Sequence, residues 1–216
     1  MPPATWLRRS GIPGFGRWFT NKALAGGGPV IDVGVHVLDL ALYYMGYPKP
    51  VSVSGVTHAE FGPRGKGTMS YGGPVADLSN GLFDVEDFAS GLMRFANGAD
   101  LMLETSWAGH QIPRSNLSLT LYGREGGAHL DHSTGKPHTL DIVTEIGGSH
   151  VQMQPIIDEA TDELNEYDRE VADFVETIRT GKPSPAPVEQ GYTLMRIIDG
   201  LYRSAETGQQ VDLTAK

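Results

Sequence analysis

The 216-residue sequence contains no cysteine and has few basic residues, and both shortages exclude classes of function. Without cysteine there is no disulfide and no thiolate metal site, so nothing marks the chain as secreted. The 17 Lys and Arg residues are outnumbered by 26 Asp and Glu, for a formal net charge of -9. This balance argues against nucleic-acid binding, which requires a basic patch. We therefore expect a cytoplasmic protein.

Two further features are missing. We find no apolar stretch that we expect to span a membrane, and no signal-peptide core at the N-terminus. No complete dinucleotide fingerprint is present, because Gly14 and Gly16 follow no apolar strand, lack the third glycine and open no helix. The glycines of residues 62–68 resemble a phosphate loop, but Lys66 is followed by glycine, which favours a mobile loop.

With 39% hydrophobic residues the chain can form one core, so we expect a single domain over residues 1–216.

The most informative stretch that is present is a glycine run leading into a mostly apolar helix over residues 26–45. At 100° per residue, Asp32, His36 and Asp39 fall on one face of this helix. The rest of the helix is apolar, so it should be packed on most sides and open to a cleft along the polar stripe. A carboxylate one turn from an imidazole can orient the ring and hold its tautomer. A solvated ion pair is the alternative, but the glycines and the apolar surroundings favour a site at which His36 exchanges protons.

The remaining pattern predicts a sheet followed by helices. Alternation on both sides of the Asn97-Gly98 turn predicts a hairpin of residues 84–96 and 99–107. Helical spacing predicts two helices that end at Gly181 and Gly208. Further strands are expected at residues 51–58, 116–122, 128–131 and 139–146, with an irregular lead-in over 1–25 and a long loop over 61–83.

Several motifs occur in the order and spacing of a known enzyme family. The run GGGPVIDVGVHVLDL at residues 26–40 resembles the glycine-rich D-x-G-x-H-x2-D signature of the glucose-fructose oxidoreductase/inositol dehydrogenase/MocA (Gfo/Idh/MocA) family. Further family-like motifs are VEDFA at 85–89, RFANG at 94–98, ETSW at 104–107, YGREGG at 122–127, FVETIRTGKP at 174–183 and YRSAETG at 202–208. The resemblance therefore covers nearly the whole chain.

The resemblance implies the C-terminal domain of such an oxidoreductase, without its N-terminal Rossmann domain. The implied fold is α+β, with an open, predominantly antiparallel β-sheet and helices on one face. The implied activity is NAD(P)-dependent oxidation of a sugar or a cyclitol-like polyol by hydride transfer. NAD or NADP would bind through a Rossmann domain that we expect to be missing from this chain. The family also implies a homodimer or homotetramer that forms through the open face of the sheet.

The resemblance also assigns residues. His36 would be the acid/base at the reacting hydroxyl, and Asp32 would orient it or contact the substrate. Gly27 and Gly28 would let the substrate or the nicotinamide approach. Asp39 matches the signature, and fixing the helix is its alternative role. The substrate contacts expected in this way are Lys22, Arg17, Asp39, Trp107 and His110.

Two other functions stay open at this point. If the chain acts without a nucleotide-binding domain, it is a non-catalytic dimerisation or ligand-binding module, because hydride transfer needs a nicotinamide. Alternatively, Asp32 and His36 bind a divalent metal, with His110 or His132 as the third ligand.

The predicted hairpin also bears on self-association. Both alternating sets of its residues include apolar side chains, and helices from one chain can cover only one face of a sheet. We therefore expect an apolar open face that pairs with a second copy. Leu92, Leu101, Leu103 and Leu119 are candidates for this face, and the sequence leaves open which of the two alternating sets faces the helices.

Overall fold

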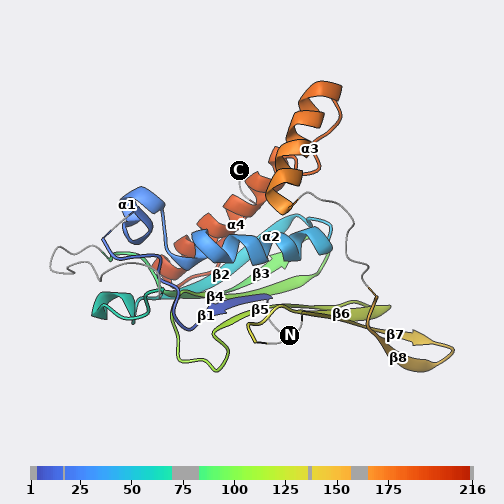
Figure 1. Cartoon of the computed structure of the whole chain (residues 1–216), viewed down its shortest axis with the longest axis horizontal. Coiled ribbons are helices and arrows are strands. Elements are labelled where there is room, and N and C mark those ends of the chain that lie inside the picture. The colour runs from blue at the N-terminus through green and yellow to red at the C-terminus, as the bar shows by residue number, and fades with distance from the viewer. Residues whose placement is uncertain (1–3, 17, 70–82, 136–137, 157–164, 215–216) are drawn as a thin grey trace.

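One open sheet, covered by helices on one face, forms the body of the molecule (Figure 1). The computed structural model describes residues 4–16, 18–69, 83–135, 138–156 and 165–214. In this part of the chain nine strands lie in the order β8-β7-β6-β5-β1-β4-β3-β2-β9. All neighbouring strands are antiparallel except β1 and β4, which are parallel. The expected α+β fold with an open, predominantly antiparallel sheet is confirmed.

The elements have the following bounds. The strands are β1 (Ala4–Arg8), β2 (Pro50–His58), β3 (Phe88–Phe95), β4 (Asp100–Ser106), β5 (Ser115–Tyr122), β6 (Gly126–Asp131), β7 (Thr139–Ile146), β8 (Ser149–Met153) and β9 (Val211–Asp212). The helical elements are the 3₁₀ turns η1 (Trp18–Thr20) and η3 (Gly62–Arg64), the π-helical turn η2 (Val30–Gly34), and the helices α1 (Lys22–Ala25), α2 (Val35–Tyr44), α3 (Glu166–Thr180) and α4 (Val188–Thr207).

The main core lies between the sheet and helices α2 and α4. Both helices turn apolar stripes toward the sheet, α4 over β2 and α2 over β1 and β5, as their helical spacing predicts. Burying each such side chain stabilises the fold by about 1.5–3 kcal/mol. The most deeply buried members are Val37, Leu38, Ala41 and Leu42 of α2, Ile197, Ile198 and Leu201 of α4, and Val53, Met93 and Leu103 of the sheet.

The structure corrects the prediction of an apolar open face. Leu101, Leu103 and Leu119 are at most 4% exposed and belong to the core. Of the four predicted residues only Leu92 lies on the other face, beside Met102 of β4. Most of their neighbours on that face are small or polar, such as Thr5, Ser90, Glu104 and Ser118. The strands therefore alternate apolar-inward and polar-outward, as is usual for an antiparallel sheet that is packed on one side only.

Three strands were not predicted. Residues 4–8 were expected to be irregular, yet β1 lies between β4 and β5 in the middle of the sheet. Five residues carry too little local pattern, and the pairing depends on partners about 100 positions away in the sequence. Strands β8 and β9 are similarly short. Most of the predicted loop at 61–83 falls outside the described residues.

The expectation about membrane-spanning length also needs correction. Lys22–Tyr44 is long and apolar enough to span a membrane by length and composition, with a mean hydropathy of 1.3. In the structure, however, Val30, Val37, Leu38 and Leu42 of this segment are buried against the sheet. The segment therefore serves as a helix of the core.

Candidate functional site

The polar stripe predicted for the glycine-rich segment is divided between two kinds of helix. The Val35 N–H donates to Val30 O, so residues 30–34 form a π-helical turn before α2 begins. A π turn is wider than an α turn and often occurs at functional sites. Asp32 lies in the π turn and His36 in α2, so the 100° spacing assumed from the sequence does not hold between them.

Asp32 is held by Arg8 of β1 and by Trp107, which directly follows the neighbouring strand β4. The Trp107 indole Nε1–H donates to Asp32 Oδ2 over 2.7 Å. Arg8 Nη1 lies 4.0 Å from the same oxygen, and both charged side chains are partly exposed. In the described chain Oδ1 has no partner, so it is available to a ligand hydroxyl. Trp107 itself is fully buried, so it contributes to the site by fixing Asp32 and does not line a pocket as predicted.

His36 is the exposed member of the pair. Its ring lies 5.9 Å from the ring of Trp6, and it lines a cavity of about 580 Å³ between α2 and the start of α4. No hydrogen bond joins His36 to Asp32 in the described residues, contrary to the sequence-based expectation. Arg8 stacks over Trp6 at 4.9 Å, so β1 places Arg8 and Trp6 between the two predicted catalytic residues. Sequence analysis missed both, because it did not predict β1.

Asp39 has a structural partner in the same cavity. It accepts a short hydrogen bond from the Tyr47 hydroxyl. Burial and the Asp39 carboxylate raise the pKa of Tyr47 above its usual range. Tyr47 has a positive φ of 48°, which an L-residue rarely adopts, so this bond stabilises the turn between α2 and β2. This bond agrees with the helix-fixing role that was the alternative for Asp39, and its predicted contact with a substrate stays a prediction.

The glycine run lies against a buried carboxylate. Glu86 accepts hydrogen bonds from the Gly28 N–H at 3.0 Å, the Val30 N–H at 3.2 Å and the Tyr202 hydroxyl at 2.8 Å. A Cβ on Gly27 would lie 1.9 Å from the Tyr202 hydroxyl, and one on Gly28 would lie 2.1 Å from the backbone oxygen of Glu86. The structure therefore requires both glycines for packing. Their predicted role at the cofactor stays a prediction.

Glu86 is the buried group that sequence analysis did not single out. Burial raises its pKa, and the hydrogen bonds that it accepts oppose this shift. Burial and Glu86 also raise the pKa of Tyr202. The signal was the acidic pair at residues 86–87 just before a strand. Asp87 likewise accepts backbone N–H bonds from Glu60, Phe61 and Gly62.

The other predicted contacts do not gather around His36. Lys22 lines a separate cavity of about 320 Å³ with His58 and Tyr202. His110 is exposed, and its ring packs on Phe61 with centroids 5.1 Å apart. Arg17 lies outside the described residues.

The metal alternative finds no support in the described residues. They contain no group of three or more His, Asp or Glu side chains that could hold a metal ion. His132, one expected third ligand, stacks on His138 with ring centroids 3.5 Å apart. Burial and the nearby His138 lower the pKa of His132.

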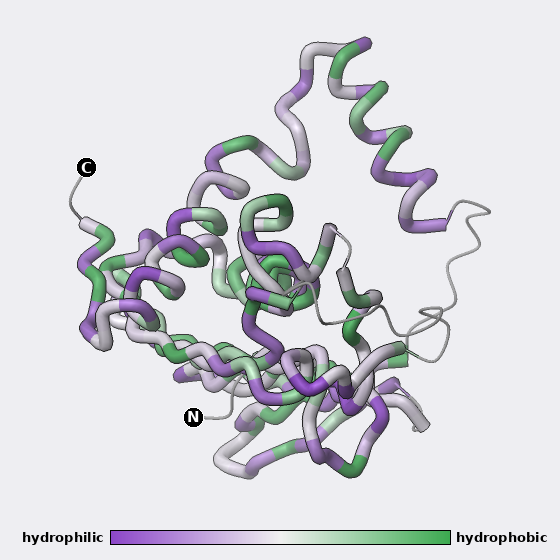
Figure 2. The backbone as a smooth tube through the Cα atoms, turned by 90° about the vertical axis from the view of Figure 1, so that its left-hand side faces the viewer, coloured by the Kyte–Doolittle hydropathy of each residue, from purple (hydrophilic) through white to green (hydrophobic). Residues whose placement is uncertain are grey.

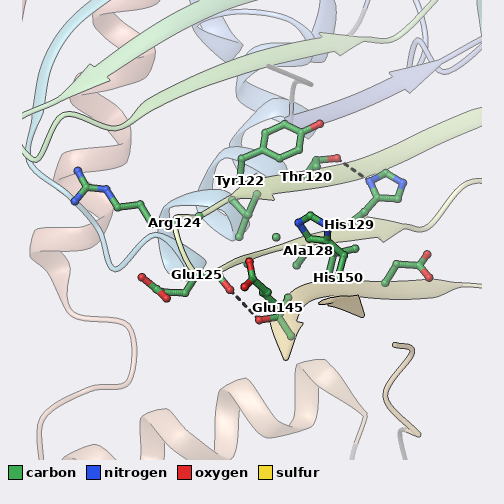
Figure 3. A pocket seen from close by; sticks show the side chains of 15 residues that line it. Thr120, Tyr122, Arg124, Glu125, Ala128, His129, Glu145 and His150 are labelled. Carbon is green, nitrogen blue, oxygen red and sulfur yellow. Dashed lines mark hydrogen bonds between the residues drawn. The ribbon is translucent and has the colours of Figure 1, made fainter. Parts of the chain in front are cut away.

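A cavity of about 600 Å³ lies away from this helix, on strands β5 to β8 (Figure 3). Tyr122, Arg124, Glu145 and His150 line it, and the Thr120 hydroxyl hydrogen-bonds His129 Nδ1 over 2.7 Å. Thr120 follows the core residue Leu119 on β5, and His129 of β6 is its cross-strand partner, so both lie on the open face of the sheet.

The C-terminal alpha/beta domain of the Gfo/Idh/MocA oxidoreductase family matches residues 6–213. The chain belongs to this family. It is 35% identical over 208 residues to D-glucoside 3-dehydrogenase of Escherichia coli, covering 96% of this chain and 54% of the relative. It is 25% identical over 187 residues to D-xylose 1-dehydrogenase (NADP(+)) 2 of Haloferax volcanii, covering 87% of this chain and 48% of the relative.

Solved structures of the family share the fold. A levoglucosan dehydrogenase in complex with NADH and L-sorbose superposes with a TM-score of 0.74 at 22% identity, over 98% of this chain and 57% of the other. This chain therefore spans about half the length of the relatives that it matches.

Replacing Trp107 by Phe should destabilise the fold by about 2–4 kcal/mol. The change removes a hydrogen bond to a carboxylate and leaves a cavity in the core. Urea unfolding measures the effect. Trp6→Phe is the matched control, because the partly buried Trp6 indole donates over 3.2 Å to the Ser115 hydroxyl, and its loss should cost about 1 kcal/mol. If both variants lose the same free energy of unfolding, the hydrogen bond from Trp107 to Asp32 adds nothing to stability.

Proposed function

We propose that this chain forms the substrate-binding part of an NAD(P)-dependent dehydrogenase that oxidises a sugar hydroxyl. The observation that carries the proposal is that the motif segment presents an anchored Asp32 and, four residues later, an exposed His36 that lines a cavity. The sugar class is supported by the printed activities of the relatives, which act on a glucoside and on xylose.

Each of the two residues has a task in this reaction. Asp32, with Oδ2 held by Trp107, can accept a hydrogen bond from a sugar hydroxyl through Oδ1. As the hydroxyl carbon loses a hydride and becomes a carbonyl, the hydroxyl oxygen loses its proton to the His36 imidazole. A positioned acid/base of this kind contributes about 10²- to 10⁴-fold to the rate.

The described residues do not form a dinucleotide site. Gly14 and Gly16 lie outside any helix, and the glycines at 27 and 28 are packed against Tyr202 and Glu86. The nicotinamide, which supplies the hydride acceptor, must therefore be held by other residues. The alternative of a non-catalytic ligand-binding module applies if no such residues act with this chain.

The test is a fusion enzyme, in which this chain is joined to the part of the E. coli relative that lies outside the match. We expect the fusion enzyme to reduce NAD⁺ or NADP⁺ when it is given glucosides or aldoses. If it binds NADH but oxidises none of these sugars, the proposed function is wrong.

We also propose that two copies pair through the open face of the sheet. Leu92 and Met102 are cross-strand neighbours on that face among small polar residues, so the interface would be mixed rather than apolar. A two-fold arrangement would set the same patch of each copy against the other.

Light scattering of the 216-residue chain at micromolar concentrations should give the mass of a dimer or a tetramer. Leu92→Arg should lower the mass to that of a monomer, because it places a charge at the pairing surface. Leu24→Arg, at an exposed position of α1, is the control and should leave the mass unchanged. A monomeric mass for the unchanged chain would refute this pairing.

A further inference from the structure

A further cavity of about 340 Å³ lies one side chain away from Asp32, and its lining is basic. The helices lie on one side of the sheet in both views (Figures 1 and 2), and the cavity lies on that side, because its residue Arg8 reaches Asp32 in the π-helical turn. The described residues that line it are Arg8, Ser10, Met69, Arg114, Ser115 and Thr134. None of them is acidic, although the whole chain has a net charge of -9.

Strand pairing brings the two arginines of this cavity together from distant parts of the sequence. Arg8 ends β1 and is the register partner of Ser115, which begins β5. The Arg9 N–H donates to Arg114 O over 2.9 Å, which fixes the backbone of Arg114 beside the end of β1. Two guanidinium groups from neighbouring strands therefore line one small space.

Arg8 connects this cavity to the proposed active site. Its Nη1 lies 4.0 Å from Asp32 Oδ2, and its guanidinium stacks over the Trp6 ring at 4.9 Å. A guanidinium carries five N–H donors in a planar fork, so one Arg can contact a carboxylate on one edge and a ligand anion on another. A substrate whose hydroxyl binds Asp32 can therefore reach Arg8 with a second group of the same molecule.

The hydroxyls of the cavity have different tasks. Ser115 Oγ accepts from the Trp6 indole over 3.2 Å, so its own proton can be donated to a ligand. The hydroxyls of Ser10 and Thr134 donate to backbone oxygens over 2.6 and 3.3 Å, so they shape the wall. The donors that face a ligand are thus two guanidinium groups and the Ser115 hydroxyl.

This set of donors recognises phosphate and carboxylate groups. Arg binds either group through two parallel N–H···O bonds, and such charge-assisted bonds are roughly twice as strong as neutral ones. The volume of the cavity lies at the small end of the range of about 300–1,000 Å³ for small-molecule sites. It therefore suits one anionic group with its link to a sugar ring.

We propose that this cavity is an anion subsite, and that the preferred substrate is a sugar that carries a phosphate or a carboxylate group. The proposal rests on the proposed function, because it adds a contact to the same substrate. Arg8 and Arg114 bind the anionic group, while Asp32 and His36 engage the hydroxyl that is oxidised. The subsite thereby fixes which hydroxyl of the sugar faces His36.

Calorimetry with the 216-residue chain tests the anion subsite without relying on turnover. Inorganic phosphate, glucose-6-phosphate and glucuronate are titrated into the chain at low ionic strength, with glucose as the neutral ligand. We expect saturable binding of the anions that weakens as salt is added, because the contact is ionic. The tighter of the two anionic sugars shows whether a phosphate or a carboxylate fits better. If none of the anions binds, the subsite is wrong.

Paired substitutions locate the bound anion. Arg114→Gln should lower the affinity for phosphate by about 10- to 100-fold, as expected for the loss of hydrogen bonds to a charged group. Its side chain is exposed, so thermal unfolding should hardly change. Arg124→Gln is the matched control, because Arg124 is also exposed, lies beyond the other end of β5 and lines the separate cavity on the outer strands. Equal affinity of the two variants would show that phosphate binds elsewhere.

In the fusion enzyme the subsite should determine the choice of sugar. We expect kcat/KM for glucose-6-phosphate or glucuronate to exceed that for glucose by about tenfold or more. Arg114→Gln should remove most of this ratio, and Arg124→Gln should leave it unchanged.

The outcomes separate the two proposals. Phosphate binding that only Arg114→Gln weakens supports the anion subsite, even if the fusion enzyme oxidises no sugar, in which case only the proposed function fails. A fusion enzyme that oxidises glucose at least as well as the anionic sugars supports the proposed function and overturns the anion subsite as part of the substrate site.

Discussion

His36→Ala should lower the turnover of the fusion enzyme by about 10²- to 10⁴-fold, which is the range for the loss of a positioned acid/base. Folding should hardly change, because His36 is exposed and its ring packs only loosely on Trp6. Steady-state kinetics with the best sugar, together with thermal unfolding, measures both effects.

Asp39→Asn is the matched control for this prediction. Asp39 lies on the same helix and in the same cavity, but its carboxylate is engaged by Tyr47. We expect a much smaller loss of turnover than for His36→Ala. If the histidine variant keeps its turnover while its melting temperature drops, the role of His36 is structural.

Glu86→Ala should destabilise the chain by about 3–5 kcal/mol, because it leaves two backbone N–H groups and the Tyr202 hydroxyl buried without their acceptor. Glu86→Gln should cost much less, since the amide oxygen can take the place of Oε1, which accepts from all three donors. Urea unfolding of the two variants gives the comparison.

The pH dependence of the free energy of unfolding reports on the pKa of Glu86 in the folded chain. Burial raises its pKa above 4.5, so the folded state binds the proton more tightly than the unfolded state does. The stability that this proton contributes is present below the unfolded pKa and is lost as the pH rises through the folded pKa. The stability of the unchanged chain relative to Glu86→Gln should therefore fall over that interval. If this relative stability instead rises with pH, the hydrogen bonds that Glu86 accepts lower its pKa by more than burial raises it.

The parts of the fold that depend on local pattern could be predicted from the sequence. The hairpin around Asn97-Gly98 and the helices ending at Gly181 and Gly208 are confirmed. β1 could not be found in this way, because its place beside β4 and β5 is decided by distant partners. The identity of the packed face also escaped prediction, since the alternation of Leu101 and Leu103 does not say which side the helices cover.

In the candidate site, too, the features set by local sequence could be predicted and those set by distant residues could not. The motif placed Asp32 and His36 on one segment, but the π turn between them could not be predicted from helical spacing. Arg8 and Trp6 reach the site only through β1, so the residues between Asp32 and His36 were missed. Glu86 was quoted as part of a motif, but its role depends on backbone N–H groups that only the folded chain brings together.

Titration of the fusion enzyme with a glucoside, followed through the ring signals of its histidines by NMR, shows whether the sugar binds beside Asp32 and His36. We expect the signal of His36, assigned by comparison with His36→Ala, to shift with saturation, and Asp32→Asn to abolish the shift. His129 and His150, which line the separate cavity on the outer strands, should not respond. A saturable response of those histidines with none at His36 would place the sugar elsewhere and show that Asp32 and His36 do not bind it.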